Sequence, residues 1–584
     1  MTGSQPGRHD QLYAAPYLRW DLKFTRRNPG LYRGEDKKVF KPDLTENARV
    51  RIDQFFSQQT HGLQPKSYSY QTLRDFLSLA DTSIFEQDAS TCLSTQDSAN
   101  IVLFDERTDD QSLNTFTSRQ WQGYEQYPPR GIAEYTAVLN SRECYEKLIQ
   151  TREHLGQSSP ERRSIYIQDL SPSCAVGLIL AVSLRYSVFL RDFLSRHVTN
   201  RVYFGVSMDY PVRPASPYAL EFHIPYFALR KSFSTSEKLH SNIVGRRSGV
   251  FADSLTRNCE PSQKEFFHEV QVSVLLVGID EWVWTLYCLV ETHFEQPRDL
   301  TELEEYVTSM RDAPSGQFGT YKQPIWNPRE YFLLVLCRRM DQATLEWQNL
   351  VETLDQRLKD LEDDTFVKPS AESLAGRNSD ISRINDYTWA IQVLQLFTNT
   401  LVKTIESWQE FSQIHLPTFL PGEGQPDYSS QVPSHLQRLD RDISELRYFH
   451  TLLGQRIAAF ESRRSMRLID INEILNTSAL METRISNTQA ADIGLLTKVT
   501  VVYLPLGLVT AFFSMSFMQL VGSWRSYLIV LIPFTLVSLV ISFNLQFIYY
   551  APRWIGQKIR MMRPSVNILS QLEAGLHVGY DKTA

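Results

Sequence analysis

The chain has 584 residues, of which 42% are hydrophobic and 22% are charged. This length is enough for two or three domains, and the composition allows a packed soluble core. The net charge of -6 at neutral pH argues against a general nucleic-acid-binding protein, because such proteins present a basic face to the phosphate backbone.

The cysteines also exclude some classes of site. They are scattered and form no CxxC pair: Cys92, Cys144, Cys174, Cys259, Cys288 and Cys337. This spacing indicates thiols in a reducing compartment rather than a disulfide framework or a zinc site. The sequence contains no P-loop, GxGxxG, HExxH or GxSxG motif, so we predict a protein that is not an enzyme and holds no cofactor.

The N-terminal region, 1–150, is the least informative part of the sequence. Its first 27 residues contain no apolar core, so we expect neither a secretory signal nor a mitochondrial presequence. The stretches 1–45 and 83–120 are polar, and we expect them to be partly disordered.

Residues 151–325 have the pattern of a cytosolic α/β domain. Runs rich in Val, Tyr, Phe and Trp are typical of strands and are separated by short turns. We predict strands at 202–206, 220–226, 270–277 and 281–291, and helices around 173–196.

Residues 326–432 form a predicted cytosolic helical region. Apolar residues recur at helical spacing over 328–361 and 381–413, which indicates two long amphipathic helices. The connectors 362–379 and 417–433 contain Pro, Gly and Ser and are predicted to be loops.

A very long stalk helix is predicted to follow over 433–498. Its apolar stripe is made of Leu436, Leu439, Ile443, Leu446, Phe449, Leu453, Ile457, Phe460, Leu468, Ile471 and Leu475. A continuous helix over 434–518 would be about 130 Å long, and a helix of that length must pack against other helices or other copies. The alternative is a break into two helices near 476–487 or at Gly494.

Two uncharged segments close to the C-terminus predict a membrane hairpin. Residues 499–518 and 527–550 each have the length of a bilayer-spanning helix, and the loop 519–526 between them is short. Positive residues lie before the first span and in the basic tail 551–584, which predicts a multi-pass protein with both termini in the cytosol. The plasma membrane is the expected location, with an organelle membrane as the alternative.

Four segments resemble a known family. RRSIYIQDLSP (162–172), LEFHIPYFALR (220–230), NPREYFLLVLCRRM (327–340) and VVYLPLGLVTAFFSM (501–515) are similar to the CorA-type magnesium channel superfamily, and more narrowly to its large fungal branch. The resemblance implies an α+β membrane protein, with a cytosolic α/β domain, a helical layer, a very long stalk helix and two C-terminal transmembrane helices. It also implies a homopentamer with a central pore lined by the first span.

The resemblance assigns the pore mouth to Ser514, Met515 and Ser516, where the family has Gly-Met-Asn. In the family, the Asn side chains ring the mouth and hold a hydrated divalent cation. A ring of Ser516 hydroxyls would offer neutral oxygens to that hydration shell, which suits magnesium because it gives up its water reluctantly.

Helical spacing suggests further pore-lining candidates. They are Thr500, Pro505, Val509, Thr510, Phe512 and Phe513. The apolar members would form a constriction that gates by dewetting, or they would simply pack against neighbouring helices. The external loop has no Asp or Glu and carries Arg525, so it lacks the acidic ring that concentrates cations.

A cytosolic acidic run is the candidate regulatory metal site. It comprises Asp360, Glu362, Asp363 and Asp364, and the family binds regulatory magnesium at cytosolic acidic residues between protomers. The alternative is a solvated helix face.

We therefore predict a homopentameric channel or transporter for a divalent cation, with magnesium as the expected ion. The alternative is a non-conducting, membrane-anchored scaffold or signalling protein with the same fold, because Ser-Met-Ser replaces the family triplet.

Overall fold

The chain forms two compact units, Met1–Ser465 and Met466–Ala584. The computed structural model describes residues 20, 24, 48–57, 67–85, 100–108, 131–135, 138–149, 162–183, 185–208, 217–233, 250–251, 263–292, 301–308, 311–316, 325, 327–363, 374–420, 432–514, 524–525, 527–540 and 544.

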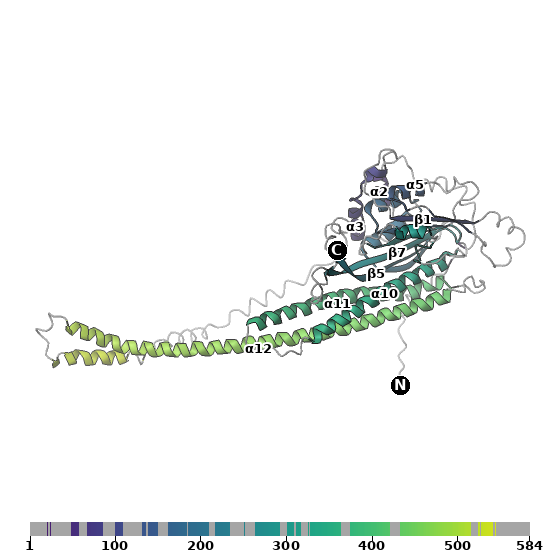
Figure 1. The fold of residues 1–584 in the computed structure, drawn as a ribbon. Coiled ribbons are helices and arrows are strands. Elements are labelled where there is room, and N and C mark those ends of the chain that lie inside the picture. Colours follow the sequence, from purple (N-terminus) through teal and green to yellow (C-terminus); the bar gives the residue numbers. More distant parts are fainter. Residues whose placement is uncertain are drawn as a thin grey trace, which may run out of the picture. The chain divides into compact units, whose positions relative to one another are not determined.

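The first unit is built on a mixed β-sheet (Figure 1). Its described strands are β1 (Ile101–Thr108), β2 (Gly131–Tyr135), β3 (Arg162–Gln168), β4 (Tyr203–Met208), β5 (Tyr218–Phe233), β6 (Val250–Phe251), β7 (Gln263–Gly278) and β8 (Trp284–Val290). Their order is β2-β1-β3-β8-β7-β5-β4, and β6 pairs with β7. Only the β3–β8 pair is parallel among these strands. The predicted strands are confirmed as β4, β5, β7 and β8, and β5 and β7 are longer than predicted.

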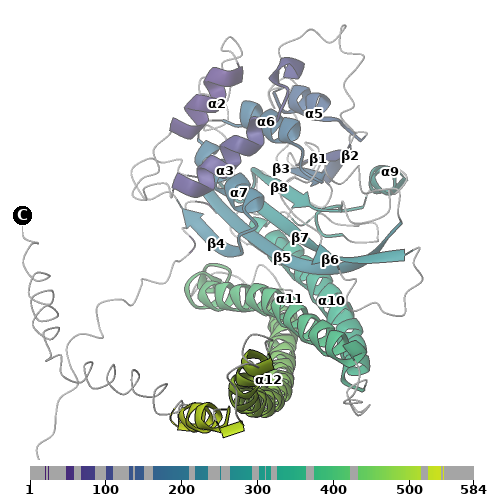
Figure 2. The ribbon, with the colours of Figure 1, turned by 90° about the vertical axis from the view of Figure 1, so that its left-hand side faces the viewer.

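Five short helices cover one face of this sheet, as Figure 2 shows. They are α2 (Ala48–Ser57), α3 (Ser67–Leu77), α5 (Ser141–Ile149), α6 (Pro172–Ala181) and α7 (Ser187–Val198). The sequence explains why α6 begins at Pro172. The hydroxyl of Ser171 caps the helix by accepting a hydrogen bond from the N–H of Cys174 at 3.1 Å, and a proline is favoured in the first turn of a helix. Val182 is extended and ends the helix, so the helical region predicted around 173–196 consists of two helices.

Strand β1 lies within 83–120, the stretch that was predicted to be partly disordered. Ile101 and Leu103 lie in the core beneath the short helices, whereas Val102 lies in the core on the other face. Successive side chains of a strand point to opposite faces of the sheet, so β1 is buried on both faces. β1 pairs with both β2 and β3, so strands from both sides of residue 150 belong to one sheet.

Helices α10 (Pro328–Asp363) and α11 (Leu374–Ile414) cover the opposite face, and the first part of α12 (Val432–Ser514) packs against these two helices. A 3-10 turn, η6 (Leu416–Thr418), follows α11. The side-chain oxygen of Asn327 accepts the N–H of Arg329 at 2.9 Å and caps α10. The predicted helices are confirmed, but the loop predicted over 362–379 is wrong where α11 begins at Leu374.

Helix α12 continues without a break from Val432 to Ser514. The near-continuous stalk is therefore confirmed, and the alternative break near 476–487 or at Gly494 is excluded. The first half of its apolar stripe is buried with α10 and α11 in one core, at Leu439, Ile443, Leu446, Phe449, Leu453 and Phe460.

Two aromatic residues of the N-terminal region, Trp20 and Phe24, form an aromatic anchor that contacts both the sheet and α10. The rings of Trp20 and Phe24 lie 4.8 Å and 5.0 Å from the ring of Tyr218 in β5. The guanidinium of Arg329 lies 4.9 Å from the centre of the Trp20 ring. The N–H of Glu281 donates to the carbonyl of Phe24 at 2.9 Å. This anchor therefore contacts the start of β5, the β7–β8 turn and the start of α10.

Replacing Phe24 with Ala should lower the free energy of unfolding by about 3 kcal/mol, because a buried aromatic side chain would be replaced by a cavity. Thermal unfolding of the purified protein measures the change, with Leu79→Ala as the control because Leu79 is 76% exposed. Equal stability of the two variants would contradict the assignment of Phe24 to the core.

Candidate functional site

Four of the predicted pore residues have side chains that the structure describes, and they lie in the C-terminal part of α12: Thr500, Val509, Thr510 and Ser514. The three hydroxyl residues are exposed, and Val509 is buried. At 100° per residue, Thr500 and Ser514 lie on one side of the helix and Val509 on the opposite side. The candidates therefore divide between two faces of α12.

The other candidates stay predictions. Met515 and Ser516 lie outside the described residues, as do the side chains of Pro505, Phe512 and Phe513.

The hydroxyl groups near the helix end donate to their own backbone. Thr500 Oγ1 donates to the carbonyl of Leu496 at 2.8 Å, and Ser514 Oγ donates to that of Ala511 at 2.8 Å. Thr510 Oγ1 donates to the carbonyl of Leu506. Because each hydroxyl donates its proton to a backbone carbonyl of the same helix, its oxygen remains available as a hydrogen-bond acceptor on the helix surface. Such oxygens accept hydrogen bonds from the water shell of a cation.

Around these hydroxyls, the surface of α12 is apolar. Tyr503, Leu504 and Leu508 are all exposed. Within the described residues, α12 is the one helix long and apolar enough to cross a membrane, and 6% of its most apolar window is buried. That low burial distinguishes it from the core helix of a soluble protein.

A shorter apolar helix spans Tyr527–Val540. Just before it, the ring of Trp524 stacks on that of Tyr527, with 6.2 Å between their centres and 30° between their planes. Trp and Tyr are the side chains that gather where a membrane meets water. The remainder of the predicted second span, 541–550, is outside the described residues except for Asn544.

The proposed regulatory acids lie at the end of α10. Asp360, Glu362 and Asp363 belong to its last turns, where the structure does not describe their side chains, and Asp364 is outside the described residues. Among the side chains that the structure describes, no three His, Cys, Asp or Glu groups are arranged to hold a metal ion.

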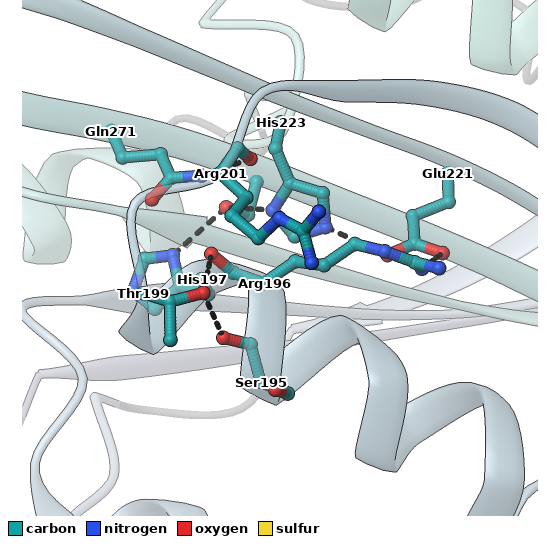
Figure 3. A network of polar contacts seen from close by, with 9 residues as sticks. Ser195, Arg196, His197, Thr199, Arg201, Glu221, His223 and Gln271 are labelled. Carbon is teal, nitrogen blue, oxygen red and sulfur yellow. Dashed lines mark hydrogen bonds and ion pairs between the residues drawn. The ribbon is translucent and has the colours of Figure 1, made fainter. Parts of the chain in front are cut away.

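A buried polar cluster lies between α7 and the sheet, and the sequence analysis did not predict it (Figure 3). Arg196 Nη1 donates to Glu221 Oε2 at 2.6 Å, and His223 Nε2 lies 2.7 Å from Glu221 Oε1. Ser273 Oγ lies between two imidazoles, 2.7 Å from His223 Nδ1 and 2.8 Å from His197 Nδ1. Residues from α7, β5 and β7 thus form one hydrogen-bonded chain.

Electrostatics hold Glu221 in its ionised form. Burial raises the pKa of its carboxyl, but the charge of Arg196 and the hydrogen bond to His223 outweigh burial, so the pKa of Glu221 is lower than usual. An ionised Glu221 only accepts hydrogen bonds. It therefore fixes the His223 proton on Nε2 when that imidazole is neutral.

Chemically, the cluster combines a hydroxyl, an imidazole and a carboxylate, the groups of a nucleophilic triad. Yet Ser273 and His223 have no exposed surface, so the hydroxyl cannot meet a substrate in this conformation. The arrangement instead ties α7 to two central strands. Its signal in the sequence was the alternation of polar residues in apolar strands, Glu221 and His223 in β5 and Gln271 and Ser273 in β7.

Comparison with known proteins gives structural similarity only. No protein-family model matches the sequence, and no curated protein matches it. The complete CorA magnesium transporter from Methanocaldococcus jannaschii is similar in structure, with a TM-score of 0.28 and 10% identity over 67% of this chain and 92% of that one. The soluble domain of CorA from the same organism has a TM-score of 0.25 and 9% identity over 52% and 87%. Both TM-scores are low, so the functional proposal rests on the residues of this chain.

Replacing Glu221 with Gln should destabilise the protein by about 3 kcal/mol above pH 5, because Arg196 would lose its buried partner. The wild type should lose this advantage as the pH falls through the lowered pKa of Glu221, since a carboxyl with a depressed pKa stabilises the fold only while ionised. Unfolding measured against pH tests both expectations, with the exposed Glu304→Gln as the control. A pH-independent difference would contradict the ionised state of Glu221.

Proposed function

We propose that this chain is a CorA-like, homopentameric channel or transporter for a divalent cation, with magnesium as the expected ion. Residues 499–518 and 527–550 would be its two membrane spans, and both termini would lie in the cytosol. Ser514, Met515 and Ser516 would form the pore mouth.

The observation that carries this proposal is the change in surroundings along α12. As far as Phe460, its apolar stripe is buried in the soluble core. From Met466 onward most of its described large apolar side chains are exposed, at Met466, Leu468, Ile469, Ile474, Leu475, Leu480, Met481, Ile485, Ile493, Leu495, Leu496, Val499, Tyr503, Leu504 and Leu508. So much exposed apolar surface requires a cover, and lipid together with other copies of α12 would provide it.

Three further features support a membrane-spanning, conducting assembly. The hydroxyls of Thr500, Thr510 and Ser514 leave acceptor oxygens on the span, which suits passage of a cation with its water. The stacked Trp524 and Tyr527 suit the external membrane interface. Positive residues before 499 and after 550 favour the cytosol for both flanks.

A second candidate is a non-conducting scaffold or signalling protein. It is favoured by the sequence of the external loop, where 519–526 contains no acid and carries Arg525. Such a loop would repel cations rather than concentrate them. This candidate keeps the membrane hairpin and the assembly but removes the flux.

Expression of the wild type should restore growth and magnesium uptake in cells that lack their own magnesium transporters. Ser516→Leu should lower this uptake at least about 10-fold, because it replaces the proposed ring of hydroxyls with apolar side chains. Ser538→Leu, in the second apolar helix, is the matched control and should leave uptake unchanged.

The oligomeric mass of each variant in lipid nanodiscs separates loss of flux from loss of assembly. A pentamer that carries no ion in any variant would favour the scaffold. A monomer in lipid would contradict both the pore and the assembly.

A further inference from the structure

A buried carboxylate lies at the beginning of α12. Asp442 is 1% exposed and sits beside Leu439 and Ile443 in the stripe that packs into the core with α10 and α11. Its Oδ1 accepts a hydrogen bond from Arg441 Nη2 at 3.2 Å. Within the described structure, its buried Oδ2 has no hydrogen-bond partner. A buried acceptor left in this state costs free energy, and more so when it carries charge.

The two arginines near Asp442 are shared with a second acid. Asp341, on α10, lies 2.7 Å from Arg438 and 3.7 Å from Arg441. Arg441 is also 61% exposed, so solvent weakens its attraction for Asp442. Among the described residues, the charges that act on Asp442 are therefore the like charge of Asp341 on α10 and the positive charges of Arg438 and Arg441 on α12, both of which also pair with Asp341.

The pKa of Asp442 reflects these surroundings. Burial raises it to about 6, the hydrogen bond from Arg441 opposes this change, and the charge of Asp341 adds to it. The neighbouring Cys337 thiol on α10 also has a pKa raised by burial, to about 11, and so stays protonated in this range.

We propose that the protonation state of Asp442 controls how stably the first part of α12 packs against α10. This packing is most stable when the Asp442 carboxyl is protonated, and we call this device the lock. Protonation removes a buried charge and its repulsion by Asp341, and it turns Oδ1 or Oδ2 into a hydrogen-bond donor. Ionisation leaves the carboxylate in the same apolar surroundings and loosens this contact.

The direction of the pH effect follows from linkage. The folded-state pKa of Asp442 is above its ordinary value of 3.8, so the folded state gains stability as the pH falls through about 6 toward 4. Titration of His435 has the opposite effect on the stability of the folded state, because burial and the charges of Arg338 and Arg438 lower the pKa of its imidazole. The folded state therefore loses stability as the pH falls below about 6.5, where an unfolded His takes up its proton. A comparison of variants separates these two effects.

Helix α12 also carries the proposed first span. A proton at Asp442 would thus change the packing of the helix that lines the proposed pore, a consequence that rests on the proposed function. The lock itself does not depend on ion flux.

Hydrogen exchange of the full-length protein in lipid nanodiscs tests the lock, with Asp442→Asn as the variant. At pH 8 this variant should exchange more slowly than the wild type over 436–446 and 336–346, because it lacks the buried charge. The ratio of wild-type to variant exchange rates should fall about 30-fold between pH 8 and pH 4.5, as expected for a folded-state pKa of about 6. His435→Gln in both backgrounds removes the opposing titration.

Asp440→Asn is the matched control, since Asp440 is exposed two residues away, and it should behave like the wild type. If Asp442→Asn exchanges as fast as the wild type at pH 8, or if the ratio is independent of pH, the lock is wrong. Arg441→Gln provides a second test should Asp442→Asn fail to fold. It should move the transition to higher pH, and an unchanged midpoint would overturn the proposal.

Discussion

The apolar surface of α12 is the constraint on which the rest of the structure depends. One uninterrupted helix, Val432–Ser514, buries its first apolar residues in the core of the first unit and exposes most of the described ones that follow. Most of the stability of a helix in a protein comes from packing of its apolar face rather than from propensity. Its first part is stabilised by α10 and α11, and in the proposed assembly its last part would be covered by lipid and other copies of the helix. The fold and the proposed function both follow from this one requirement.

The first unit holds the beginning of α12 in its core. The sheet is buried on both faces, and its two cores contain most of the large apolar side chains of the described unit. The polar cluster around His223 and Ser273 joins α7 to β5 and β7, while ion pairs such as Arg438–Asp341 join α12 to α10. Polar contacts of this kind favour one register between packed elements, because a slip would leave polar groups without partners.

The long elements were predictable because their patterns persist over many residues. The apolar stripe of α12 and the periodicity of α10 and α11 repeat over many helical turns, and β5 and β7 are long runs of Val, Phe and Tyr. In contrast, β1 is short and lies between polar segments, and its burial depends on pairing with β3, about 60 residues later.

The polar cluster was missed for a similar reason. Ser273 meets His223 and His197 across sequence separations of 50 and 76 residues, which no local pattern encodes. Asp442 lies among other charged residues in the sequence of α12, and only its burial in the fold distinguishes it from the exposed Asp440.

The most direct test of the central claim is the water accessibility of single cysteines along α12 in liposomes, in a background without the native cysteines. We predict that a membrane-impermeant thiol reagent reacts widely over 466–498 but, beyond Val499, only along one side of the helix. Protection of the remaining sides would show that lipid or neighbouring helices cover them. Reaction on every side through to Ser514 would contradict a membrane span and, with it, the proposed pore.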